Sequence, residues 1–506
     1  MAGAPKDSST PTSTQIDTEK RAHHEHAERL EDFGGESSLP APPNLSEEEE
    51  RRLYHKIDVR LMPILSVMYL FSFLDRGNIG NAKLQGLIQQ LDLYGNRFNI
   101  ALTMYFIPYC IFECPANLVL KKFRPSIWLP SITVAWGIVM TLMGIIKTYE
   151  QLVAMRVLLG IAEAGLFPGV VYYLTLWYPR QKLQYRIGLF FGAASMAGAF
   201  SGLLAYGISF MGGTRGLLGW SWIFILEGIA TVVVGIVAFV VMVDFPSTAK
   251  FLTPEERAFV VWKKKYDNSS VGEDEHFAFR HIVSAFTDWQ VWAHIGVYMS
   301  IIAPLYGITL FLPSIINTFG YTTTISQLLT VPPYLVATIV LFIFAHYSDK
   351  WGKRSPFILF GLTMILIGFS INISTAPSGV KYFGTFFVVT GSYSAFPGVV
   401  AWLGSNLSGQ YKRGVGMALQ IGIGNFSGAI ASNIYRARDS PRYILGHGLE
   451  LMFVGFGYIA IPALMYTYTK INKRRDEAAA SGNERKYTVQ ELRDLGDRAP
   501  DFRYML

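Results

Sequence analysis

Charge and cysteine are both scarce in this sequence, and each scarcity excludes a class of protein. Only 16% of the 506 residues are Asp, Glu, Lys or Arg, whereas roughly 25% is usual for soluble domains. The two cysteines, Cys110 and Cys114, fall in one apolar segment, which excludes a disulfide framework. The sequence shows no nucleophile–base arrangement and no cluster of metal ligands, so we expect neither an enzyme nor a cofactor.

Hydrophobic residues make up 51% of the chain and gather in stretches of membrane-spanning length. About 20 consecutive apolar residues cross a bilayer as a helix. The stretches that reach this length predict twelve spans, at about 61–82, 98–119, 127–146, 151–177, 187–209, 221–243, 290–313, 326–346, 356–374, 382–403, 415–434 and 446–469. The net charge of +7 is spread over loops and tails, so it indicates membrane topology and not nucleic-acid binding.

Polar segments between the spans divide the chain into five parts. We expect a disordered N-terminal tail, a six-helix half, a linker, a second six-helix half and a C-terminal tail, at 1–45, 46–243, 244–289, 290–470 and 471–506. Ser46 and Glu49 form a capping-box pattern that predicts where the first helix begins. Thr253, Pro254 and Glu256 likewise predict the start of a surface helix in the linker.

Lysine and arginine set the expected orientation. Clusters of basic residues fall in loops on the same side as both tails and the linker, and the positive-inside rule makes that side cytosolic. One loop on the opposite side, with Arg436, Arg438 and Arg442, does not fit the rule. The other loops on that side hold few basic residues, so we expect both termini in the cytosol.

Short segments of the first half recur in the second. FPGVV occurs at 167–171 and again at 396–400, an offset of 229 residues. GAFSGLLA at 198–205 matches GNFSGAIA at 424–431, an offset of 226 residues. Matches with like spacing in both halves indicate a duplicated six-helix unit. Transporters built in this way bind substrate near the middle of the membrane, between their repeats.

The sequence AHYSDKWGKR at 345–354 is similar to the loop signature of the major facilitator superfamily, with Ala345 where that signature begins with Gly. The runs FLDRGNIGNAKLQGL, RVLLGIAEAGLFPGVVYYL and LGDRAPDFRYML closely resemble the fungal anion:cation symporter family, which includes allantoate, nicotinate, pantothenate and biotin permeases. NIYRARDSPRYILGHGLEL is most similar to the nicotinate-permease branch. The resemblance implies an all-α membrane protein with twelve transmembrane helices in two pseudo-symmetric halves. It also implies a gating loop formed by Asp349, Lys350, Gly352, Lys353 and Arg354.

Several charged residues lie well inside the predicted spans, all of them in the first half. They are Asp75, Arg76, Glu113, Arg156, Glu163 and Glu227. A charge within a span costs at least about 2.5–3.5 kcal/mol and marks a substrate or proton path. Four acids and two arginines cannot all be ionised in a dry site, so at least one carboxyl group should hold a proton at neutral pH. The second half has no charge at comparable depth, since His447 and Glu450 lie near a span end.

Roles for four of these residues follow from the resemblance. In related organic-anion symporters, an Asp-Arg pair in the first span, and an Arg with an acid seven residues later in the fourth span, form the proton and substrate machinery. Carried onto this sequence, Asp75 and Glu163 couple protons, whereas Arg76 and Arg156 bind substrate. Arginine suits a carboxylate because its planar guanidinium contacts two oxygens at once. Glu163 is expected to be the carboxyl group that holds a proton at rest.

Two further residues are expected at the substrate site. Tyr109 matches a substrate-contacting tyrosine of the family, although a core aromatic residue has the same pattern. Asn425 stands where the first-half repeat has Ala199, so it either reads polar atoms of the substrate or forms a hydrogen bond between helices. Glu113 and Glu227 are expected to be mainly structural.

These observations predict a monomeric, proton-coupled symporter that imports a small organic carboxylate, nicotinate or a similar vitamin first, across the plasma membrane. Its expected partners are the small organic anion, protons and the lipid bilayer. The alternatives are the same fold transporting another organic anion such as allantoate or pantothenate, or exporting a secondary metabolite. A nutrient-sensing receptor without net transport is the alternative from a different class.

Overall fold

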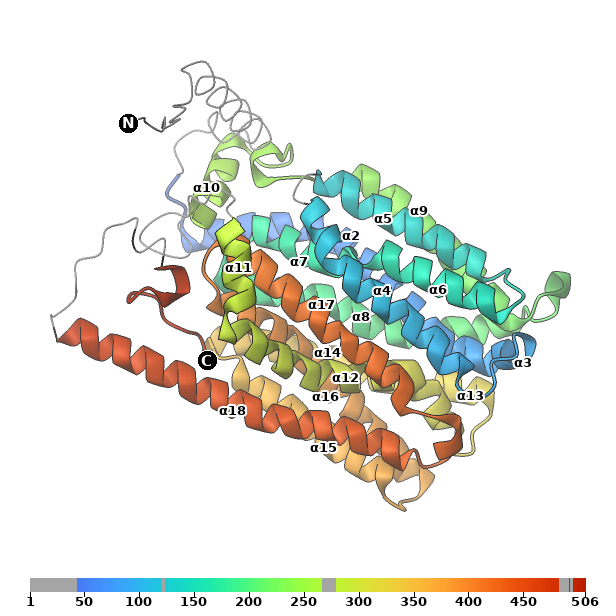
Figure 1. Cartoon of the computed structure of the whole chain (residues 1–506). Coiled ribbons are helices and arrows are strands. Elements are labelled where there is room, and N and C mark those ends of the chain that lie inside the picture. Colours follow the sequence, from blue (N-terminus) through green and yellow to red (C-terminus); the bar gives the residue numbers. More distant parts are fainter. Residues whose placement is uncertain (1–42, 121–122, 266–278, 482–490, 492–494) are drawn as a thin grey trace, which may run out of the picture.

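Long helices make up most of the computed structural model, which describes residues 43–120, 123–265, 279–481, 491 and 495–506. Figure 1 shows them running side by side as one bundle. The first half contains α2 (Glu47–Ala82), α4 (Arg97–Leu120), α5 (Pro125–Met143), α6 (Tyr149–Glu163), α7 (Leu166–Trp177), α8 (Arg180–Ser209) and α9 (Gly219–Val241). The second half contains α12 (Trp289–Asn317), α13 (Thr323–Leu328), α14 (Val331–Trp351), α15 (Ser355–Ile373), α16 (Ser378–Asn406), α17 (Gln410–Ile434) and α18 (Ile444–Ala480).

Some of the expected polar segments cannot be compared with the structure. The N-terminal tail expected at 1–45 lies almost entirely outside the described residues. The same holds for 266–278 in the linker and for 482–490 and 492–494 in the C-terminal tail. Two linker helices, α10 (Pro254–Lys265) and α11 (Phe279–Thr287), flank the linker segment that is left out.

Eleven helices in the described part of the chain are long and apolar enough to cross a membrane. The second span expected from the sequence corresponds to α4. Its 24 residues give a helix about 36 Å long, which is long enough to cross a bilayer, and it packs inside the bundle against α6 and α17. Tyr105, Tyr109 and Glu113 on this helix belong to the polar site described below.

Reciprocal side-chain caps start two helices where the sequence predicts. At α2, the Glu49 N–H donates to Ser46 Oγ at 3.3 Å and the Ser46 N–H donates to Glu49 Oε2 at 2.9 Å. At α10, Thr253 and Glu256 make the same pair of contacts at 3.2 and 2.8 Å. Each pair satisfies backbone N–H groups that a first helical turn leaves without partners. Both predicted helix starts are confirmed.

The helices pack as two groups that meet along an interface. In the first half α2 packs on α8 and α5 on α9, and in the second half α12 packs on α17 and α15 on α16. Between the halves, α4 packs on α17 and α8 on α14. The two FPGVV copies lie in α7 and α16, and the rings of Phe167 and Phe396 approach to 6.0 Å between centroids. The repeated segments therefore meet where the two halves face each other.

Glycines allow α8 of the first half to approach α14 of the second. A Cβ on Gly198 would overlap the ring of Tyr334, and one on Gly202 would overlap the hydroxyl of Thr330. Such close approach gives membrane helices extensive van der Waals contact without a hydrophobic driving force between them. The two halves are in tight contact along this seam.

Residues 495–506 fold back onto one end of the second half, beside the linker helices (Figure 1). The backbone of Met505 pairs with the Asn406 amide through both its N–H, at 2.7 Å, and its C=O, at 3.0 Å. Asp497 binds Lys412 at 2.5 Å. Through these contacts residues 495–506 bind both the end of α16 and the beginning of α17.

Candidate transport site

An arginine and a glutamate form an ion pair at the centre of the first half. Arg76 on α2 contacts Oε1 of Glu163 on α6 through Nε, at 2.8 Å, and through Nη2, at 2.7 Å. Both side chains are buried, with exposures of 5% and 0%. Ala164 and Gly165, both with right-handed helical backbone angles, separate α6 from α7, so Glu163 lies beside a slight irregularity in one membrane span.

Hydroxyl groups complete the surroundings of Glu163. Ser72 Oγ donates to Oε1 at 2.5 Å, and the Tyr105 hydroxyl donates to Oε2 at 2.7 Å. Together with the two guanidinium contacts from Arg76, these hydroxyls surround both carboxyl oxygens with hydrogen-bonding groups. The expectation that Glu163 holds a proton at rest stays a prediction.

The network continues from Arg76 into the second half. Arg76 donates to the hydroxyl of Tyr306 on α12 at 3.1 Å and to that of Tyr109 on α4 at 3.2 Å. Tyr306 donates to Asn425 Oδ1 on α17 at 3.2 Å, and Asn425 Nδ2 donates to Glu113 Oε2 on α4 at 3.3 Å. The polar contacts therefore cross the interface twice, and they join both halves through one buried chain of groups.

Arg156 lies beside this network without a counter-charge. It is on α6 with 2% exposure, and its guanidinium carbon is 5.5 Å from the ring centroid of Tyr105. Among the residues that the structure describes, Arg156 has no carboxylate partner, and its Nε has no hydrogen-bond partner. The guanidinium carbon of Arg76 lies 5.8 Å from the same ring. The site therefore holds one buried arginine that makes no ion-pair contact with a described residue, although the charge of Glu163 acts on it from a greater distance. A ligand carboxylate in contact with Arg156 would offset the cost of burying its charge.

Asp75 is not part of the network that holds Arg76. Its Oδ2 accepts from Trp136 Nε1 on α5 at 3.0 Å and from Thr231 Oγ1 on α9 at 3.2 Å. Its Oδ1 has no hydrogen-bond partner among the described residues. Consecutive residues of a helix point about 100° apart, so Asp75 faces the packed interior of the first half. The structure thus brings together Arg76, Glu163, Tyr109 and Asn425, places Arg156 beside them and leaves Asp75 apart.

Sequence analysis missed three members of the network: Ser72, Tyr105 and Tyr306. Tyr105 and Tyr109 are four residues apart, so one face of a helix carries both hydroxyls, and this spacing was a usable signal. Nothing in the local sequence distinguishes Tyr306 from a packing residue. Glu113 was expected to be structural, yet it accepts a hydrogen bond at the end of the network.

The second half also contains a buried acid. Glu450 lies near the end of its span, as expected from sequence, since α18 begins only six residues earlier, at Ile444. It is nevertheless fully buried, because distance from the end of a span does not measure burial. Here α18 packs against α12 over the turn that carries Glu450.

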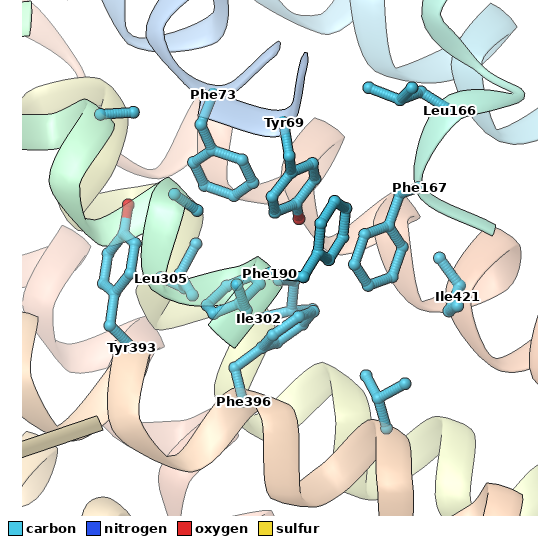
Figure 2. Packing of buried hydrophobic residues seen from close by; sticks show 14 of the residues in the cluster. Tyr69, Phe73, Leu166, Phe167, Phe190, Ile302, Leu305, Tyr393, Phe396 and Ile421 are labelled. Carbon is cyan, nitrogen blue, oxygen red and sulfur yellow. The ribbon is translucent and has the colours of Figure 1, made fainter. Parts of the chain in front are cut away.

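Aromatic side chains fill the interface next to the ion pair. Figure 2 shows Tyr69, Phe73, Phe190 and Phe396 gathered between the two halves. The rings of Tyr69 and Phe190 stack at 4.2 Å between centroids.

Between α2, α8, α12 and α14 there is a cavity of about 20 Å³, which has room for a water molecule but not for an organic anion. Arg76, Arg156 and Glu163 are themselves at most 5% exposed, so a substrate contacts them only after the helices around them move.

The signature loop connects α14 to α15 at the end of the bundle that holds the linker helices. Asp349 and Arg354 form an ion pair at 2.7 Å, and the Arg354 side chain is 2% exposed. Gly352 has φ +63°, a left-handed conformation that ends α14 and suits glycine. Lys350, Gly352 and Lys353 are exposed. The helix α14, which carries Asp349, packs on α8 of the first half, and the gating role of the loop stays a prediction.

Two duplicated groups of membrane helices, with ionised side chains buried at their interface, define a secondary transporter. The sequence model of the Major Facilitator Superfamily matches residues 65–432. The chain belongs to this family, and it is a transporter and not an enzyme.

Individual proteins resemble this chain over most of its length. The MFS-type transporter cnsO of Penicillium expansum is 35% identical over 470 residues, which cover 90% of each chain. The high-affinity nicotinic acid transporter of Saccharomyces cerevisiae is 31% identical over 471 residues, which cover 93% of this chain and 87% of that one. An inward-facing, occupied structure of a bacterial homologue of the human lysosomal transporter Spinster gives a TM-score of 0.56 at 14% identity, over 79% of this chain and 95% of that one. This last likeness shows the fold alone.

Proposed function

We propose that this chain is a proton-coupled symporter of a small organic carboxylate, of the anion:cation symporter type, with nicotinate or a similar vitamin as the first candidate. The observation that carries the proposal is Arg156, a buried arginine without a carboxylate partner among the described residues. A substrate carboxylate would supply the missing charge, and a guanidinium can hold both of its oxygens. The 31% identity to a nicotinic acid transporter supports nicotinate as the first substrate to test.

Competition for Arg76 supports proton coupling. While Glu163 is ionised, it occupies Arg76 through two guanidinium nitrogens. A proton on Glu163 removes its negative charge and weakens that pair, so Arg76 becomes available to the substrate carboxylate beside Arg156. The ion pair forms again when proton and anion have both left. A proton bound alone would leave Arg76 without a counter-charge, and a substrate anion bound alone would add a second negative charge beside the Glu163 carboxylate. Both states are costly in a dry site, so the proton and the anion are carried together.

The remaining site residues have subsidiary roles in this proposal. Tyr109 holds the Nη2 end of Arg76, at 3.2 Å, and so fixes the direction in which its guanidinium points. Asn425 has both donor and acceptor atoms at the interface, which suit a ring nitrogen or another polar atom of the substrate. Asp75 is the second candidate for proton coupling, since it is buried and has no positive partner in contact among the described residues.

Uptake of labelled nicotinate into proteoliposomes that contain the purified chain tests the proposal. An inward proton gradient should drive accumulation above equilibrium, and a protonophore should abolish it, with protein-free liposomes as the control. Proton-driven uptake of labelled allantoate or pantothenate, without uptake of labelled nicotinate, would reassign the substrate within the same fold. Binding of a carboxylate without any uptake would instead support the nutrient-sensing receptor.

We also propose that the linker and both termini lie in the cytosol and that the chain resides in the plasma membrane. Basic side chains such as Lys182, Lys350 and Lys353 gather at the end of the bundle that holds the linker helices, as the positive-inside rule requires. An epitope inserted in α10 should be inaccessible to antibody in intact cells, whereas one beside Arg215, between α8 and α9, should be labelled. The reverse labelling pattern would overturn this orientation.

A further inference from the structure

The second half has three acidic residues between the linker and the C-terminal tail. Two of them form ion pairs, Asp349 with Arg354 at 2.7 Å and Asp439 with Arg436 at 2.8 Å. The third, Glu450, is fully buried in α18, and neither of its carboxyl oxygens has a hydrogen-bond partner among the described residues. Burying a charged carboxylate in this way would cost several kcal/mol. The closed conformation therefore accommodates Glu450 as a neutral acid.

Glu450 lies between α18 and α12, at a point where α12 has no side chain. A Cβ on Gly307 would overlap Oε1 of Glu450, so the carboxyl group rests against the backbone of α12. The ring of Tyr435, which follows α17, borders the same space. The Tyr435 hydroxyl forms a hydrogen bond with Nδ1 of His447 at 3.0 Å. His447 precedes Glu450 by three residues on α18, so both side chains lie on one face of that helix.

Few titratable groups face Glu450. The titratable residues beside it are Tyr435, directly after α17, and His447 on α18. The facing turn of α12 carries Gly307, which has no side chain. Farther out, the ring of Tyr443 lies 5.6 Å from that of Tyr435, and the charge of Lys381 on α16 acts on His447. Within the described chain, no charged side chain contacts the Glu450 carboxyl group.

We infer that Glu450 is a proton-binding site of the second half, reached from the bundle end opposite the linker by way of His447 and Tyr435. The ionised carboxylate takes a proton from water and becomes the neutral acid, which the closed protein can bury. It returns the proton to water when separation of the halves hydrates the space beside Gly307. The step consists of protonation and deprotonation of one carboxyl group, and water is donor and acceptor in both directions.

The contact of Glu450 with Gly307 on α12 connects it to the transport site. Gly307 adjoins Tyr306, whose hydroxyl contacts both Arg76 and Asn425. Pro304 removes one backbone hydrogen bond of α12 just before these residues, which makes this part of the helix easier to displace. A charge on Glu450 would therefore act on the helical turn that holds the central arginine. The inference rests on the proposed proton coupling and adds a second proton to it.

Proteoliposomes test this by comparing the parent with Glu450→Gln and with a control, Glu477→Gln, which alters a 64% exposed acid on the same helix. Glutamine imitates the neutral acid but releases no proton. We expect exchange of labelled for unlabelled nicotinate to persist in Glu450→Gln. The slope of the logarithm of the accumulation ratio against the imposed pH difference should fall by the contribution of one proton per substrate. The control should keep the parent slope.

A second pair of variants, Gly307→Ala and its control Gly448→Ala, tests the same site while the Glu450 side chain itself is unchanged. Gly307→Ala should displace the Glu450 carboxyl group and lower the slope in the same way. Gly448→Ala adds the same methyl group to α18 at a position with nothing within 4 Å, and it should leave the slope unchanged. Parent slopes in both Glu450→Gln and Gly307→Ala would overturn the proposal.

Infrared spectra of the purified chain give a readout that needs no transport. The C=O stretch of a protonated, buried carboxyl group should be present in the parent and should lose one component in Glu450→Gln. Identical spectra in the carboxylic acid region would contradict a proton on Glu450. A parent that shows this component without proton-driven uptake would support the Glu450 site and overturn the proposed function, so the two failures are distinguishable.

Discussion

Arg156→Lys should raise the KM for nicotinate by roughly 10- to 100-fold while the protein still reaches the membrane. Lysine keeps the charge but loses the planar fork that contacts two carboxylate oxygens. A hydrogen bond to a charged group contributes about 1.5–3 kcal/mol, and each 1.4 kcal/mol is about tenfold in affinity. Folding should change little, because Arg156 makes no ion pair with a described residue. Uptake kinetics and the amount of transporter at the membrane measure the two effects separately.

Two other substitutions of arginine by lysine make this result interpretable. Arg438→Lys alters an exposed residue and should leave the KM unchanged. Arg76→Lys should also weaken uptake, but it breaks the existing ion pair with Glu163, so the pH dependence of uptake should change as well. A near-normal KM in Arg156→Lys would rule out Arg156 as the carboxylate ligand and would leave Arg76 as the remaining candidate.

The parts of this structure that could be predicted from sequence are those set by local patterns. The starts of α2 and α10 follow from Ser46 with Glu49 and from Thr253 with Glu256, because a capping box needs only neighbouring residues. The duplicated halves follow from repeated segments at like spacing.

The site could be predicted only in part, because its contacts join distant segments. Arg76 and Glu163 are 87 positions apart, and Arg76 and Tyr306 are 230 apart. The resemblance to anion:cation symporters suggested the two charged residues but not the ion pair between them. The burial of Glu450 could not be predicted from the sequence for the same reason, because it depends on Gly307, which lies in another helix.

Glu163→Gln should abolish proton-driven accumulation while exchange of labelled for unlabelled nicotinate continues. Glutamine can accept from one of the hydroxyls of Ser72 and Tyr105 and donate its NH2 to the other, but it carries no charge to hold Arg76 and has no proton to release. The variant therefore imitates the protonated state, in which Arg76 is available to the substrate. Substrate affinity should be equal to or tighter than that of the parent. Proteoliposome uptake with and without a pH gradient, alongside counterflow exchange, measures both properties.

The control for this variant is a buried acid of the first half that lies off the network. Glu227 on α9 accepts from Asn78 and contacts neither arginine, so Glu227→Gln should still accumulate substrate in response to the gradient. Asp75→Asn tests the second proposed proton site, and loss of accumulation there too would mean that the two acids titrate as a coupled pair. If Glu163→Gln concentrates nicotinate as well as the parent does, the proton takes another route. Glu113 is then the next candidate, because its carboxyl group terminates the same network at Asn425.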